Sequence, residues 1–155
     1  MPNMTQVPFC GMFVYHICDR HFKITDSKDS YLKGIFLMLV IGGYYMGMDK
    51  LYTAESLAFC SSAILFGIIW RVPHFGIFLI SFGILLIPMI FFNGMLTGLF
   101  TKQALVEYNW QEFSNKRFLS FPVEDVGFGF GLLYGVVCLN FFLTNGISDI
   151  YKDTK

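Results

Sequence analysis

The amino-acid sequence predicts an all-α membrane protein: a bundle of about four transmembrane helices with a partial N-terminal span. Two observations predict this class. Of the 155 residues, 55% are apolar and only 14% are charged, and the apolar residues gather in long runs with at most one charged residue each. In lipid, such a run must pair its own backbone amides, which a helix does without a partner. We therefore expect one membrane domain, residues 1–155.

The predicted spans follow one another along the chain. Crossing the bilayer core takes about 20 mostly apolar residues, with a range of about 17 to 25. Four runs have this character, at residues 34–48, 54–70, 75–100 and 126–143. The first run is short, so its helix is expected to extend back through Tyr31. Pro88 lies inside the third run and predicts a kink there.

The two ends of the chain differ from this four-span module, which covers residues 34–143. The run VPFCGMFVYHIC at 7–18 is too short to cross a bilayer, and it lacks the basic start and the cleavage site of a signal peptide. We interpret residues 1–33 as the end of a span followed by a polar loop. Residues 144–155 are predicted to form a polar tail.

Composition and spacing argue against several functions. The formal net charge is zero, which gives no electrostatic basis for nucleic acid as a partner. The sequence GFGFG at 127–131 has neither the spacing nor the preceding strand of a dinucleotide-binding fingerprint, so no FAD or NAD is expected. Neither histidines nor cysteines are spaced as metal ligands, and the cysteines are interpreted as packing residues. These residues are His16, His21, His74, Cys10, Cys18, Cys60 and Cys138.

The strongest candidate site is a pair of adjacent acids, Glu124 and Asp125, at the start of the last run. A structural interpretation exists, because Pro122 suits a helix start, Ser120 can cap it, and acids in the first turn meet the positive end of the helix dipole. It accounts for one acid better than for two. Partial desolvation and the repulsion between neighbouring carboxylates favour a protonated carboxyl, which a general acid requires. We therefore favour catalysis, with one carboxyl facing the bundle interior.

Other patterns predict contacts around this site. Gly127, Gly131 and Gly135 recur every four residues and form a face on which another helix can approach closely. Asn93 and Thr97 lie four residues apart in an apolar span, so they share a helix face. An interhelical hydrogen bond that only holds the bundle explains this pair as well as a site does.

The segment before the last run is polar and rich in aromatic residues. Tyr108 and Trp110 fit the aromatic anchors that membrane proteins place at the lipid surface. Arg117 precedes Glu124 by seven residues and is expected to fold back onto one of the carboxylates. Of the 19 phenylalanines, those lining a cavity would offer ring faces to a cationic intermediate.

Several motifs together indicate a family. They are DKLYTAESLAF at 49–59, FFNGMLTG at 91–98, EYN at 107–109, Arg117, and FPVEDVGFGF at 121–130. In order and spacing they resemble the C-terminal half of the integral-membrane bacterial lycopene cyclases, the heterodimeric or fused type that differs from the flavin-dependent cyclases. The resemblance implies a multi-pass protein of the bacterial inner membrane.

The resemblance further implies a cyclase that uses no cofactor and takes lycopene or a related linear carotenoid from the membrane lipid. The linear end of the substrate is protonated, closes through a carbocation to a six-membered ring, and loses a proton, giving γ-carotene and then β-carotene. Glu124 and Asp125 match the acidic motif, as proton donor and supporting partner. Five more residues carry over as shaping the substrate site: Asn93, Thr97, Tyr108, Asn109 and Arg117.

This family is built from two similar modules, each with an acidic motif, whereas the chain carries one. The resemblance therefore implies an incomplete copy or a subunit that needs a second cyclase module as its partner. Two other classes stay open. One is a small membrane transporter, although transporters usually place the acid in the middle of a span. The other is a non-catalytic membrane assembly subunit whose glycine face packs on another protein.

Overall fold

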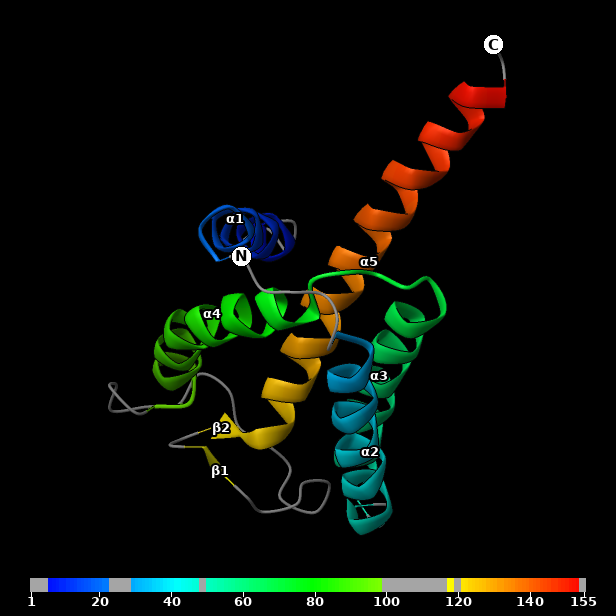
Figure 1. Cartoon of the computed structure of the whole chain (residues 1–155). Coiled ribbons are helices and arrows are strands. Elements are labelled where there is room, and N and C mark those ends of the chain that lie inside the picture. Colours follow the sequence, from blue (N-terminus) through cyan, green and yellow to red (C-terminus); the bar gives the residue numbers. More distant parts are fainter. Residues whose placement is uncertain (1–5, 23–28, 48–49, 99–116, 119–120, 154–155) are drawn as a thin grey trace.

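The computed structural model consists of helices and one short β-hairpin (Figure 1). It describes residues 6–22, 29–47, 50–98, 117–118 and 121–153. In chain order the elements are α1 (Gln6–His21), α2 (Asp29–Gly47), α3 (Leu51–Ile69), α4 (Phe75–Leu96), β1 (Arg117–Phe118), β2 (Phe121–Pro122) and α5 (Val123–Asp153). The predicted all-α membrane fold is confirmed.

Within the described residues, three helices are long and apolar enough to cross a membrane. They are Leu51–Ile69, Phe75–Leu96 and Val123–Thr144, and they correspond to the last three predicted spans. The first predicted span, residues 34–48, falls in α2, which begins upstream of Tyr31 as expected. Because α2 carries Asp29 and Lys33 near its start, it is not one of these three apolar helices.

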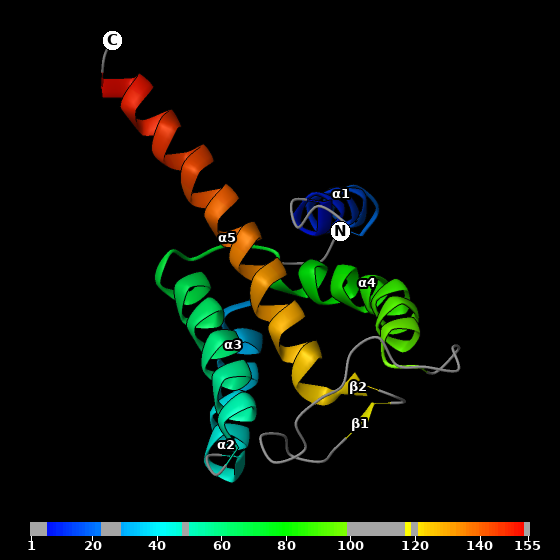
Figure 2. The ribbon, with the colours of Figure 1, turned by 180° about the vertical axis from the view of Figure 1, so that it is seen from behind.

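The described residues nearest to each end of the chain are helical. The 16-residue helix α1 is shorter than a full span and packs against α4 and α5. Helix α5 continues to Asp153, so most of the segment predicted as a polar tail extends the last helix. Figures 1 and 2 show this C-terminal part of α5 projecting beyond the other helices.

Helices α3 and α5 form the central pair and run in the same direction. The first turn of α3 contacts the first turn of α5, through Thr53 and Glu124, and Gly67 near the end of α3 contacts Tyr134 in α5. Helix α2 lies antiparallel beside α3 in both views. Helix α4 begins beside α5, leads away from the pair and bends along its length (Figures 1 and 2), as the internal Pro88 predicts.

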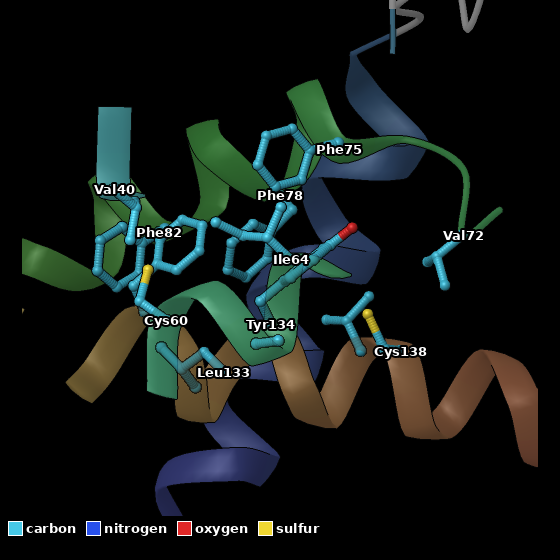
Figure 3. Packing of buried hydrophobic residues seen from close by; sticks show 13 residues of the cluster. Val40, Cys60, Ile64, Val72, Phe75, Phe78, Phe82, Leu133, Tyr134 and Cys138 are labelled. Atoms are coloured by element: carbon cyan, nitrogen blue, oxygen red, sulfur yellow. The ribbon is translucent and has the colours of Figure 1, made fainter. Parts of the chain in front are cut away.

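An aromatic core joins α4 to α5 (Figure 3). The ring of Phe78 lies 4.7 Å from Tyr134 and 5.2 Å from Phe130, in the tilted and edge-on geometries that aromatic pairs prefer. The residues of the buried cluster are Val40, Cys60, Ala63, Ile64, Val72, Phe75, Phe78, Phe82, Phe130, Leu133, Tyr134, Val137 and Cys138.

Three of the cysteines behave as predicted. Cys18, Cys60 and Cys138 are buried and carry free thiols, so they act as small packing residues. The side chain of Cys10 lies outside the part of the chain that the structure describes.

Glycines allow α3 and α5 to approach closely, as the four-residue pattern predicted. A Cβ at Gly131 would lie 2.6 Å from Cδ1 of Phe59, and one at Gly127 would lie 2.4 Å from Oγ of Ser56, so a larger residue at either position would displace α3. Gly135 differs, because its Cβ position has open space around it. Two of the three predicted glycines therefore form the contact face.

Candidate active site

The acid pair occupies the first turn of α5, directly after a β-hairpin that the sequence pattern did not predict. In the hairpin Arg117 pairs with Pro122, and Phe118 pairs with Phe121. Pro122 lacks a backbone N–H. This is no loss at the start of a helix, because the N–H groups there have no acceptor within the helix. The hairpin thus fixes where α5 starts and where its acids project.

Glu124 is buried against the first turns of α3. Its side chain is only 5% exposed. Thr53 Oγ1 donates a hydrogen bond to Glu124 Oε1 at 2.6 Å, and Ser56 Oγ donates to the main-chain oxygen of Glu124 at 2.7 Å. One hydroxyl therefore binds the carboxyl itself, while the other ties α3 to the backbone of α5.

Asp125 points in a different direction and is half-buried. Tyr52 donates its phenolic O–H to Asp125 Oδ1 at 2.8 Å. Two neighbouring donors on α3, Tyr52 and Thr53, thus bind two neighbouring acids on α5. Adjacent residues project about 100° apart on a helix, and the predicted division of one interior carboxyl and one more accessible carboxyl is confirmed.

Aromatic rings lead from the acids to the outer surface of the helix pair. The Tyr52 ring lies 5.0 Å from the ring of Phe128, which in turn lies 6.2 Å from Phe59. Phe59 is 42% exposed, so this aromatic ledge of Tyr52, Phe128 and Phe59 reaches the surface of the bundle. Its ring faces are suited to an apolar polyene or to a cation formed on one.

Asn93 and Thr97 lie at the C-terminal end of α4. Thr97 Oγ1 donates to the main-chain oxygen of Asn93 at 2.8 Å, a bond within the same helix. Between described residues, no hydrogen bond or ion pair joins either one to Glu124 or Asp125. Their role in shaping a substrate site stays a prediction.

The remaining predicted site residues come from the segment before α5. Tyr108 and Asn109 lie outside the described residues, as does Trp110. Arg117 belongs to β1, and its pairing with Pro122 brings its backbone close to the start of α5. The Arg117 side chain is not among those described, so its expected contact with a carboxylate stays a prediction.

Three residues that hold the acids, Tyr52, Thr53 and Ser56, were not predicted as site residues. The second span was predicted to start at residue 54, within the stretch that carries them. A usable signal was present, because three hydroxyl side chains at positions i, i+1 and i+4 cluster toward one side at the head of an apolar helix. Polar groups there need partners on a neighbouring helix.

No group of three or more His, Cys, Asp or Glu side chains that could hold a metal ion occurs in the described part of the chain. The described side chains around the acid pair are carboxyls, hydroxyls and aromatic rings. This set of groups is suited to proton transfer and to the stabilisation of a nearby cation.

Comparison with known proteins identifies the family. A family model described as lycopene cyclase matches residues 49–143, which include all of α3 and α4 and the acid-bearing part of α5. Neither a curated protein nor a solved structure matches the chain. The family model covers more than half of the chain and includes the acids of α5 together with the residues of α3 that bind them. The chain therefore belongs to the lycopene cyclase family.

Proposed function

We propose that this carotenoid cyclase closes the linear end of lycopene, or of a related linear carotenoid, into a β-ionone ring by acid catalysis without a cofactor. Family membership supports a cyclase function. The observation that carries the particular reaction is the carboxyl of Glu124, buried between two apolar helices beside an aromatic ledge. An alkene is protonated by a neutral acid in an apolar setting, and burial favours the neutral form of a carboxyl.

The proposed reaction balances without an added reagent. Glu124 transfers its proton to the terminal double bond, so that an O–H bond breaks, a C–H bond forms and a carbocation remains. A second double bond attacks the cation and closes the six-membered ring. A ring carbon then releases a proton to a carboxylate of the acid pair, and the ring double bond forms. Substrate and product have the same formula, first γ-carotene and then β-carotene.

The position of the acids in α5 supports this sequence of steps. Glu124 becomes negative when it gives up its proton, and the positive end of the helix dipole stabilises a negative charge in the first turn. Asp125 acts as the supporting partner, since it is more accessible and already accepts the Tyr52 hydroxyl. The ring faces of Tyr52 and Phe128 lie next to it, and each is worth about 0.5–2 kcal/mol to a cation at short range.

We further propose where the chain acts and which partner it needs. The chain acts as a multi-pass protein of the bacterial cell membrane, where both substrate and product dissolve in lipid. It also works together with a second cyclase module, because the chain carries one acidic motif.

The alternative classes find less support. A transporter acid is expected in mid-span, whereas Glu124 stands in the first turn of its helix. An assembly subunit would offer its glycine face to another protein, but Gly127 and Gly131 already contact α3.

Expression in lycopene-accumulating cells, followed by pigment analysis, tests the proposal. The chain is produced alone and together with a first-module polypeptide, as wild type, Glu124→Gln and Glu55→Gln; Glu55 is exposed on α3 and serves as the matched control. We expect cyclic carotenes from wild type and Glu55→Gln in the presence of the partner, and none from Glu124→Gln. Lack of conversion in every combination, with the protein present in the membrane, contradicts the proposal.

A further inference from the structure

We propose that Thr53 is a positioning residue that determines which oxygen of the Glu124 carboxyl carries the transferable proton. This inference rests on the proposed function of Glu124 as the proton donor. It assigns part of the chemistry to α3, on a residue outside the acidic motif, 71 positions before the acid.

The geometry of the contact supports this assignment. Thr53 Oγ1 donates to Glu124 Oε1 at 2.6 Å, and the two side chains are 9% and 5% exposed. A neutral carboxyl has one carbonyl oxygen and one hydroxyl oxygen, and the carbonyl oxygen is the better acceptor for an incoming O–H. The oxygen that accepts from Thr53 is therefore the carbonyl oxygen. The proton is placed on Oε2, on the other side of the carboxyl group.

The donor is held rigidly, so it imposes this orientation. Threonine is β-branched, which restricts its side chain to few conformations in a helix. Thr53 lies in the first turn of α3, and the hydrogen bond from Ser56 to the backbone of Glu124 fixes that turn against α5. A carboxyl group that turned over would present its hydroxyl oxygen to Thr53. This oxygen is the poorer acceptor, so the buried hydrogen bond would weaken, which opposes the turn.

The same bond favours the state after proton transfer. When Oε2 loses its proton, the negative charge spreads over both oxygens, and the hydrogen bond from Thr53 to Oε1 becomes charge-assisted and stronger. Thr53 thus orients the acid before transfer and stabilises the carboxylate afterwards. The hydroxyl should affect turnover more than the binding of the carotenoid.

Infrared difference spectroscopy of the full chain in phosphatidylcholine vesicles tests this directly. The carbonyl band of the neutral carboxyl is identified by its loss in Glu124→Gln. A hydrogen bond weakens the C=O bond, so we expect Thr53→Val to shift this band to higher frequency and Thr53→Ser to leave it near the wild-type position. Ser61→Ala is the matched control, because it removes a half-buried hydroxyl of α3 that binds only within its own helix, at the main-chain oxygen of Leu57.

Turnover in lycopene-accumulating cells that supply the partner module provides a second measurement. Thr53→Val should convert lycopene roughly 10- to 100-fold more slowly, as expected for a misoriented catalytic group. Thr53→Ser should recover most of the wild-type rate. In the vesicles, the thermal unfolding of the two Thr53 variants and of Ser61→Ala shows whether each is folded.

The outcomes separate this inference from the proposed function. A band that does not move in Thr53→Val, or that moves equally in Ser61→Ala, overturns the role of Thr53 even if Glu124→Gln is inactive. A band that moves as expected while Glu124→Gln still cyclises lycopene overturns the proposed function instead. If wild type has no Glu124-dependent carbonyl band, both are wrong.

Discussion

The two ends of the helix bundle bury carboxyl groups in different ways. At the start of α3 and α5, Glu124 accepts a hydrogen bond from the hydroxyl of Thr53 on another helix. At the opposite end of α3, Asp29 in the first turn of α2 lies 3.2 Å from the ammonium of Lys33 on the same helix. Lys33 also donates to the main-chain oxygen of Val72, in the turn between α3 and α4.

The difference indicates what each carboxyl does. Asp29 Oδ1 accepts the backbone N–H of Gly76 at 3.2 Å, so it caps the first turn of α4 from outside that helix. The N-cap residue itself, His74, makes no side-chain capping bond. A carboxylate paired with an ammonium and a helix N-terminus is a structural anchor. A carboxyl oriented by a neutral hydroxyl, as Glu124 is by Thr53, suits proton transfer.

Of the changes that test this difference between Glu124 and Asp29, we expect Glu124→Gln to have the largest effect. The amide oxygen still accepts from Thr53, so the helix contact should persist while the transferable proton is lost. Because general acids contribute about 10²- to 10⁴-fold to a rate, we expect cyclisation to fall by at least about 100-fold with little change in thermal stability. Pigment analysis and a melting curve of the same preparation measure the two. If Glu124→Gln lowers the melting temperature markedly as well as the activity, Glu124 has a structural role.

At the other end, Lys33→Met is predicted to reduce stability. It leaves the buried carboxylate of Asp29 without its cation, which costs about 3–5 kcal/mol when a buried pair is broken. The free energy of unfolding in a detergent titration measures this loss.

A double-mutant cycle provides the control for that prediction. Asp29→Asn combined with Lys33→Met removes both charges and should recover most of the lost stability, since the amide oxygen of the new asparagine side chain would still accept from Gly76. If the double variant is no more stable than Lys33→Met alone, the ion pair is not the anchor.

Local patterns sufficed for much of the fold and for the acids themselves. Long apolar runs predicted α3, α4 and the membrane part of α5, because the bilayer imposes length and composition on each helix separately. Two acids ahead of such a run were visible without any tertiary information. The angular spacing of neighbours on a helix predicted that one acid of the pair would face the interior, but not that this acid would be Glu124.

The partners of these acids could not be predicted in the same way. The bond between Thr53 and Glu124 depends on the relative rotation and register of α3 and α5, which Ser56 and the adjoining glycines determine. The pair of Asp29 and Lys33 has the i, i+4 spacing of a helical ion pair, but Asp29 lay in the segment assigned to a polar loop, ahead of the helix expected to extend back through Tyr31. Helix boundaries are the weakest part of such an assignment.

A smaller effect is expected at Gly67, where α3 accommodates the buried ring of Tyr134. An added Cβ would lie 2.2 Å from the Tyr134 hydroxyl and 2.7 Å from two ring atoms. We expect Gly67→Ala to lower the free energy of unfolding by about 1–3 kcal/mol, the usual cost of overpacking. Gly135→Ala is the matched control: its Cβ has open space and alanine favours a helix by roughly 0.5–1 kcal/mol. Equal destabilisation of both variants would argue against a close contact at Gly67.

The smallest effect is expected for Tyr52→Phe, which sharpens the distinction between the two acids. The change removes the 2.8 Å hydrogen bond to Asp125 but keeps the ring that packs on Phe128. Since Asp125 is half-buried, water can replace the phenol, and the stability loss should stay near 0.5–1.5 kcal/mol, about the net worth of one hydrogen bond. Cyclisation should fall about 2- to 10-fold, less than in Thr53→Val, because the phenol binds the supporting acid and the threonine binds the proton donor. Pigment analysis of both variants side by side measures the order, and a larger loss in Tyr52→Phe would exchange the roles assigned to Glu124 and Asp125.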